Sequence, residues 1–328
     1  KQGHSGAGGD IRAQNNMHYF NNRWVNNGRL DKLVTTPRTN KALVSSILVK
    51  RMAAHGDVIM ATGVLPGLKK RHPQAFIDFW TAVPSVLHNN PYVRKVVNQE
   101  AQIEKQYGLI VNLDNAYEYH PDWHMRDCYA DAAGIPSKEC VPMVVAIEPG
   151  VKLPLKYAVL HSKRQIDGDW VGRSWPEANY LEIAARLRDD GYQIVLVGST
   201  NDVAVPCDFD LRGQTTINQL SWVMKNAALF IGMDSMPMHL AMIHNTPGVA
   251  FFGCILPEKR LTGTSLVPVN AHWLDCIGCH HKQTPPIHGT TNCLRGDTAC
   301  QSTVTVDQMW DAILKATKKK QYRLTVIT

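Results

Sequence analysis

The sequence has no apolar run close to twenty residues, so we expect no membrane-spanning helix. Its first residues, KQGHSGAGGD, begin with Lys rather than Met and lack the apolar core of a secretory signal. No short internal repeat is apparent. Hydrophobic residues are not scarce, because they make up 44% of the 328 residues, which excludes global disorder. We therefore expect a cytoplasmic globular protein of two domains or one large domain.

Acidic residues are fewer than basic ones, 28 against 35, which gives a net charge of +7 and a pI of about 8.9. This balance suits an anionic ligand such as a phosphate, a lipid headgroup or a nucleic acid. Several lysines lie in KATKKKQYR near the C-terminus. An ordinary solvated surface is therefore an equally good explanation of the positive charge. Residues 11–40 combine Asn, Arg and aromatic residues without a clear period, so residues 1–43 are expected to form an N-terminal extension.

From residue 44 the sequence alternates strand-like and helix-like segments. The first half has expected strands at LVSSILV, AFIDFWT, VRKVVN and YGLIVNLD. After a Pro-bearing linker near residues 148–156, the alternation restarts at YAVLHS. Such alternation is typical of parallel sheets with helices on both faces. We predict an α/β protein with two doubly wound, Rossmann-like domains, residues 44–150 and 151–328, that face each other across a cleft.

The first strand ends just before a Gly-Asp pair, Gly56 and Asp57. Ligands of open α/β sheets bind beyond the carboxyl ends of the strands, so Asp57 is expected to point into the cleft. Gly56 permits a tight turn and a close approach by the ligand. Two interpretations of Asp57 remain open: it is the N-cap of a helix at 58–70, or a general base that takes a proton from an acceptor hydroxyl.

An equivalent junction on the second sheet is GMDSMPMHLA, residues 232–241. Asp234 and Ser235 stand at a helix entrance, where Ser235 can be the N-cap and Pro237 is tolerated in the first turn. The N–H groups and the dipole of such an entrance suit a diphosphate. His239, one turn further on, is either packed core or a phosphate contact.

A segment rich in cations, HSKRQIDGDWVGRSW, follows the strand YAVL. Its charged side chains include Lys163, Arg164 and Arg173. Cations at the mouth of a cleft suit an anionic leaving group, although an exposed polar loop has the same composition.

Three motifs in this order resemble glycosyltransferase family 9, which includes the ADP-heptose lipopolysaccharide heptosyltransferases. They are ILVKRMAAHGDVIMATGVLPGLKKRHPQAFIDFWT, LHSK with RSWPEANYLEIAARL, and FIGMDSMPMHLAMIHNTPGVAFFG, and they cover about residues 44–256. The resemblance implies a GT-B architecture in which the first domain binds the acceptor and the second binds a nucleotide-sugar, such as an ADP- or UDP-sugar. It also implies inversion at the sugar carbon without a bound metal.

The same resemblance assigns roles to individual residues. Asp57 matches the general base of the family. The donor-site residues implied by the motifs, together with the nearby cation, are Lys163, Arg173, Asp234, Ser235, Met236 and His239. Two of them depart from the family pattern, because Met236 stands where a small residue is usual and Arg173 stands where Lys is usual.

The expected reaction is sugar transfer to an acceptor hydroxyl of a lipopolysaccharide saccharide or a protein. A hydroxylated DNA base is a further alternative, because the basic balance and the aromatic arm suit phosphates. A sugar-nucleotide-binding protein with weak catalysis is another, favoured by Met236. The last alternative is a sugar-nucleotide epimerase of similar two-domain shape.

Four of the eight cysteines are crowded into an insertion at residues 276–300. Their pattern is C-x₂-C-x₁₃-C-x₆-C, formed by Cys276, Cys279, Cys293 and Cys300. Thiolates at such spacing can share one structural zinc or iron ion. Two disulfides or four free thiols remain alternatives. Among members of the resembled family, the autotransporter heptosyltransferases are similar in carrying a four-Cys iron site in this region.

Overall fold

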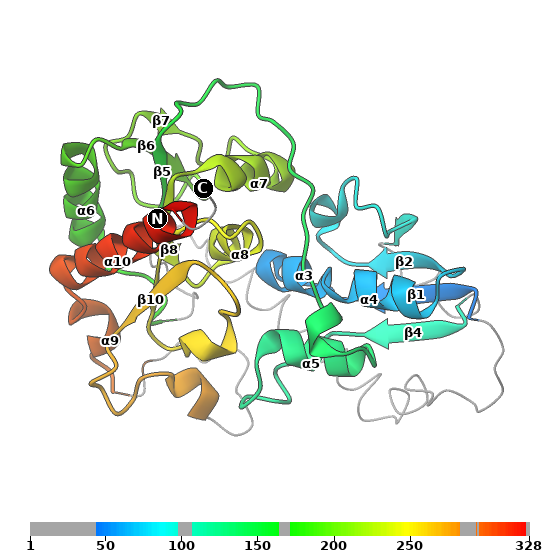
Figure 1. Cartoon of the computed structure of the whole chain (residues 1–328). Helices are drawn as coiled ribbons and strands as arrows, with labels where there is room; N and C mark the ends of the chain where they lie inside the picture. Colours follow the sequence, from blue (N-terminus) through cyan, green and yellow to red (C-terminus); the bar gives the residue numbers. More distant parts are fainter. Residues whose placement is uncertain (1–43, 98–106, 164–170, 283–292, 294, 326–328) are drawn as a thin grey trace, which may run out of the picture.

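The computed structural model describes residues 44–97, 107–163, 171–282, 293 and 295–325. The predicted N-terminal extension at 1–43 lies outside the described residues, as does Arg164. The described chain forms two lobes, each built on a parallel sheet (Figure 1). Within the described residues, no helix combines the length and the apolar character needed to cross a bilayer.

The first lobe has a four-stranded sheet in the order β3-β2-β1-β4. Its strands are β1 (Ser46–Lys50), β2 (Phe76–Trp80), β3 (Lys95–Val97) and β4 (Leu109–Asn112). Alternate strand residues such as Ile47, Val49 and Phe79 are buried in one cluster with three helices. These helices are α3 (His55–Ala61), α4 (Val64–Arg71) and α5 (Met125–Ala132).

The second lobe has a six-stranded parallel sheet in the order β10-β9-β8-β5-β6-β7. Its strands are β5 (Tyr157–His161), β6 (Gln193–Val197), β7 (Phe209–Asp210), β8 (Leu229–Met233), β9 (Gly248–Phe252) and β10 (Leu266–Asn270). One face packs on α7 (Ile217–Asn226) and α8 (Met236–Ile243), and the other on α6 (Glu177–Asp189) and α10 (Val306–Thr325). A short helix, α9 (Ala299–Ser302), precedes α10.

The two lobes meet where α3 lies against α8 (Figure 1). Each of these helices follows the carboxyl end of a strand, β1 in the first lobe and β8 in the second. One cluster of buried apolar side chains includes residues of both helices, among them Val58 and Met238. The junctions that the sequence singled out therefore come together at the contact between the lobes.

The predicted succession of parallel strands and helices is confirmed, with one difference. The sequence pattern predicts a single helix from Asp57 to His72, but α3 ends at Ala61 and α4 begins at Val64. The chain that connects the lobes crosses at this break. The Val141 N–H donates to the Gly63 carbonyl over 2.9 Å, and the Met143 N–H donates to the Thr62 hydroxyl over 2.9 Å. The first bond occupies the Gly63 carbonyl, and the second holds the Thr62 side chain against the connecting chain.

Candidate active site

Asp57 lies in the first turn of α3, but it is not the N-cap that one interpretation of the sequence required. The N-cap is Ala54, and Asp57 is the third helical residue. Its carboxylate accepts a hydrogen bond from the Ala54 N–H over 2.8 Å, which satisfies one of the backbone donors that the helix start leaves open. The side chain is 17% exposed, so it supports the helix start and still reaches solvent.

The surroundings of Asp57 keep its carboxylate ionised. Burial raises the pKa of Asp57, but the Arg51 guanidinium, the Ala54 N–H, Arg260 and the Tyr117 hydroxyl outweigh burial and hold the pKa below 3.8. The Arg51 Nη2 atom lies 3.3 Å from the carboxylate. Asp57 is therefore a hydrogen-bond acceptor at neutral pH.

Arg51, which directly follows β1, also binds the segment that follows β4. Its Nη2 atom donates to Glu118 Oε1 over 3.1 Å, and its Nη1 atom donates to the Leu113 carbonyl over 3.1 Å. Its guanidinium lies 5.2 Å from the centre of the Tyr117 ring. Sequence reasoning missed Tyr117 and Glu118, although they follow a strand end just as Asp57 does.

Ser235 occupies the N-cap position of α8, as the sequence predicts, but its hydroxyl does not cap the helix. The Ser235 Oγ atom lies 3.0 Å from His161 Nδ1, at the end of β5. On the other side of the ring, His161 Nε2 lies 3.5 Å from a carboxylate oxygen of Asp202. His161 therefore draws the Ser235 side chain away from the first N–H groups of α8.

The predicted cations Lys163 and Arg173 both have carboxylate neighbours. Burial raises the pKa of Asp202, but His161, the Ser199 N–H and Lys163 outweigh burial and lower it overall. The positive charge of Lys163 thus stabilises the ionised carboxylate of Asp202. The Arg173 Nε atom donates to the Asp234 carbonyl over 3.2 Å, and Arg173 Nη2 lies 3.7 Å from the Asp234 carboxylate. Arg173 thus braces the turn between β8 and α8.

His239, on α8, is 4% exposed, and its Nδ1 atom has no hydrogen-bond partner among the described residues. Burial lowers the pKa of His239 to about 4, although Asp234 and Asp57 act in the opposite direction. The ring is therefore neutral at pH 7 and faces the start of α3. A Cβ atom on Gly56 would lie 2.8 Å from His239 Cδ2 and 3.7 Å from the Met236 Cα, so only glycine fits this contact without a shift.

Arg260, which sequence reasoning also missed, links the two lobes electrostatically. Its side chain belongs to the second lobe, is 5% exposed and lies 4.8 Å from the Tyr117 ring of the first. Burial lowers the pKa of Arg260, but Asp234, Tyr117 and Asp57 raise it above its ordinary value. A buried cation therefore faces carboxylates from both lobes. No motif marks it, because it follows a short 3₁₀ turn, Pro257–Lys259, rather than a strand.

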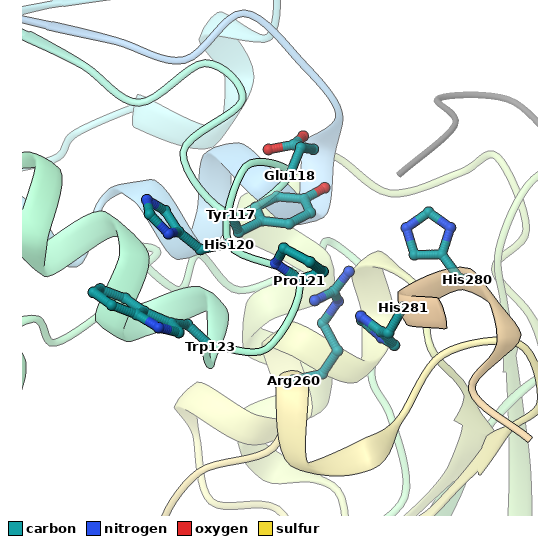
Figure 2. Close-up of a pocket in the computed structure, with 8 residues that line it drawn as sticks. All are labelled: Tyr117, Glu118, His120, Pro121, Trp123, Arg260, His280 and His281. Atoms are coloured by element: carbon teal, nitrogen blue, oxygen red, sulfur yellow. The ribbon is translucent and has the colours of Figure 1, made fainter. Parts of the chain in front are cut away.

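A pocket opens beside this group of residues (Figure 2). The first lobe lines it with the segment that follows β4, and the second lobe contributes Arg260 and two histidines of the cysteine insertion. The lining residues are Tyr117, Glu118, His120, Pro121, Trp123, Arg260, His280 and His281. The Arg51 Nη2 atom lies 3.1 Å from the lining residue Glu118 and 3.3 Å from Asp57, so the pocket lies near the carboxylate at the start of α3.

Cys276, Cys279, Cys293 and Cys300 are half-buried and form no disulfide in the structure. Burial raises the pKa of Cys300 to about 11, and negative charge on Cys279, Cys293 and Cys276 acts in the same direction. Across the described part of the chain, no group of three or more His, Cys, Asp or Glu side chains is arranged to hold a metal ion. In the described residues the four cysteines therefore do not form a set of metal ligands.

Residues 85–305 match the model of a family described as glycosyltransferase family 9 (heptosyltransferase). Among curated proteins, the chain is 24% identical over 278 residues to lipopolysaccharide heptosyltransferase 3 of Escherichia coli, covering 62% of this chain and 82% of that protein. The family match at residues 85–305 includes the second lobe through the cysteine insertion.

Among solved structures, the ADP-heptose lipopolysaccharide heptosyltransferase II of E. coli is similar with a TM-score of 0.57 and 17% identity, covering 84% of this chain and 99% of that one. The dodecameric iron-containing heptosyltransferase TibC, in complex with ADP-D-beta-D-heptose, is similar with a TM-score of 0.66 and 14% identity, covering 85% and 79%. These likenesses confirm the predicted fold of two Rossmann-like domains in the GT-B arrangement.

Proposed function

This chain belongs to glycosyltransferase family 9, and from that premise we propose that it transfers a sugar, with inversion, from a nucleotide diphosphate to an acceptor hydroxyl. The observation that carries the proposal is the convergence of Asp57 with Asp234, His239 and Arg260 at the contact between α3 and α8. The names of the similar proteins support a heptose as the sugar and ADP as the nucleotide. A hexose or a UDP donor is the alternative.

The donor diphosphate is proposed to bind at the N-terminus of α8, beside Ser235, Met236 and His239. Backbone N–H groups and the helix dipole favour an anion there. Two features support this assignment: Ser235 makes no capping bond to α8, and the buried His239 Nδ1 has no partner among the described residues. Arg173 and Lys163 contribute positive charge and order the adjoining turns.

In the proposed reaction, the acceptor oxygen forms a bond to the sugar carbon while the bond from that carbon to the diphosphate oxygen breaks. Asp57 takes the acceptor proton, and the nucleoside diphosphate leaves with the bonding electrons. Because the pKa of Asp57 is low, proton transfer is expected late, when the attacking oxygen has become acidic. Arg260 and the start of α8 stabilise the charge that develops on the leaving group, so the proposal needs no catalytic metal.

The acceptor is proposed to be a saccharide of lipopolysaccharide type, as the names of the similar heptosyltransferases indicate. The described residues offer no observation in favour of a DNA base, and the aromatic arm on which that alternative depended lies outside them. The alternative of a sugar-nucleotide-binding protein without turnover is distinguished from a transferase by the experiment that follows.

The direct test is replacement of the general base. We expect Asp57→Asn to lower kcat by a factor of about 10²–10⁴ in an ADP-heptose transfer assay while leaving ADP affinity within about twofold. The matched control is Asp307→Asn, which removes a carboxylate from the first turn of α10, paired over 2.7 Å with Arg186 and 81% exposed. Equal turnover by Asp57→Asn and the wild-type protein contradicts the assignment. Absence of transfer and of donor hydrolysis in both, over a panel of ADP- and UDP-sugars, favours the binding protein.

We also propose that Cys276, Cys279, Cys293 and Cys300 hold one structural iron or zinc ion. The C-x₂-C-x₁₃-C-x₆-C spacing supports this, as does the iron-containing TibC among the similar structures. Mass spectrometry of the purified chain is expected to find one metal ion, and Cys279→Ser to lose it. Cys207→Ser is the control, since this half-buried cysteine lies apart from the cluster. A metal-free chain in which all eight thiols react with a thiol reagent overturns the proposal.

A further inference from the structure

We propose that the pocket of Figure 2 is the acceptor subsite, and that it selects a saccharide through two neighbouring hydroxyls and one apolar ring face. The inference rests on the proposed function, because it takes Asp57 as the general base. It goes further by naming the side chains that bind the acceptor and the chemical groups that they recognise.

Glu118 supplies the first observation. Its side chain is 10% exposed and accepts from Arg51 through Oε1, whereas Oε2 has no hydrogen-bond partner among the described residues. A buried carboxylate oxygen without a partner is costly, so such atoms usually meet a donor. An ionised carboxylate only accepts hydrogen bonds, so the missing ligand group is a donor, and a sugar hydroxyl is one.

The position of Glu118 relative to Asp57 supplies the second. A single atom, Arg51 Nη2, lies 3.1 Å from Glu118 Oε1 and 3.3 Å from Asp57 Oδ2. The two carboxylates are therefore close neighbours. A hydroxyl bound by Glu118 brings the adjacent hydroxyl of the same ring towards Asp57. Glu118 thus anchors one hydroxyl while Asp57 deprotonates the next.

Trp123 supplies the third. Its ring is stacked on His120 with centroids 4.6 Å apart and planes 23° apart, and the residue is still 46% exposed. A Trp supported by stacking on one side presents a flat apolar surface with a polar edge. The C–H face of a sugar ring matches this surface.

The charges of the pocket point to a neutral part of the acceptor. On the wall from the first lobe, the carboxylates of Glu118 and Asp57 share the single guanidinium of Arg51, so this wall keeps a net negative charge that repels an anionic group. Across the pocket, burial lowers the pKa of Arg260, but negative charge on Asp234 and Asp57 raises it. His281 adds a buried Nε2 atom without a partner among the described residues, which is a further hydrogen-bonding position for a hydroxyl.

The experiment titrates the full chain with methyl glycosides of glucose, galactose, mannose and L-glycero-D-manno-heptose, without donor, by saturation-transfer NMR. ADP binding is measured separately by calorimetry. At least one glycoside is expected to bind, and Trp123→Ala and Glu118→Gln are each expected to weaken it roughly five- to tenfold. The controls are Trp273→Ala, a tryptophan of equal exposure at 44% outside the pocket, and Glu182→Gln on α6. Neither control is expected to change the affinity.

The hydroxyl pair is tested with deoxy versions of the glycoside that binds. Removal of the hydroxyl anchored by Glu118 is expected to weaken binding as much as Glu118→Gln does, and the two changes together are expected to cost no more than either alone. Failure of every glycoside to bind, or equal binding by Trp123→Ala, Glu118→Gln and the wild type, overturns the subsite. Failure of the wild type to bind ADP counts against the proposed function instead, and the glycoside titration still decides the subsite.

Discussion

His239 combines almost complete burial with a titratable ring, so its environment links the stability of the fold to pH. Burial lowers the pKa of His239 from 6.5 to about 4, so the folded chain holds this ring neutral where the unfolded chain binds a proton. Above pH 6.5 the ring is neutral in both states and does not reduce the free energy of unfolding. As the pH decreases from 6.5 to 4, the unfolded chain gains a proton that the folded chain does not, so the free energy of unfolding falls. Below pH 4 the reduction is constant.

We expect the free energy of unfolding, measured with urea, to decrease between pH 7.5 and pH 5, with a share of about 2 kcal/mol from His239. In His239→Gln, the free energy of unfolding is expected to decrease by about 2 kcal/mol less over the same pH range. His244→Gln is the matched comparison, because burial and Lys225 also lower the pKa of His244 to about 4, and each variant should remove its own portion. An unchanged slope in His239→Gln contradicts the neutral buried ring.

Single residues also show how far the sequence alone leads to the site. Asp57 was predictable, because a carboxylate after the first strand of an open sheet has a defined place. The same rule, applied to β4, points to Tyr117 and Glu118. Arg260 was not predictable, because its place depends on how the second lobe is set against the first, and no local pattern records that relation.

At the scale of elements, the distance between α3 and α8 depends on the absence of a side chain at Gly56. Alanine is a better helix former than glycine, but its Cβ atom would lie 2.8 Å from the buried His239 ring. We expect Gly56→Ala to separate the helices slightly and to lower kcat/KM by roughly 10², since small misplacements of reacting groups are costly. The loss of stability should be about 1–3 kcal/mol.

Transfer assays and urea unfolding of Gly56→Ala measure the two effects together. Gly150→Ala is the control, because a Cβ atom at Gly150 meets nothing within 4 Å. Equal activity in the two variants would mean that the spacing of α3 and α8 does not depend on this contact.

Elements were predictable where their own residues decide them. The apolar residues of α6 recur at helical spacing, and Gly191, with a φ of 77°, follows its end, where glycine is common. The break between α3 and α4 has a local signal in Gly63 and Pro66, since Pro66 has no N–H to donate to the Thr62 carbonyl, but its contacts with the distant Val141 and Met143 were not predictable. The division at residue 150 stays a prediction, since sequence spacing is its basis.

At the scale of the whole molecule, alternating strands and helices predicted two parallel sheets, and comparison with solved structures confirms that arrangement. The arrangement of the lobes was beyond such patterns, because it depends on side chains that meet only after both sheets have formed. Asn218 of α7 is an example, since it donates to the Val145 carbonyl over 2.8 Å. It ties the second lobe to the chain that connects the two.

The apolar cluster that α3 shares with α8 makes the two halves poor candidates for modular exchange. A chimera that joins the first lobe of this chain to the second lobe of a relative would pair two faces that had not been fitted to each other. Engineers who wish to recombine specificities within this family should therefore move both helices as one block and graft loops around them.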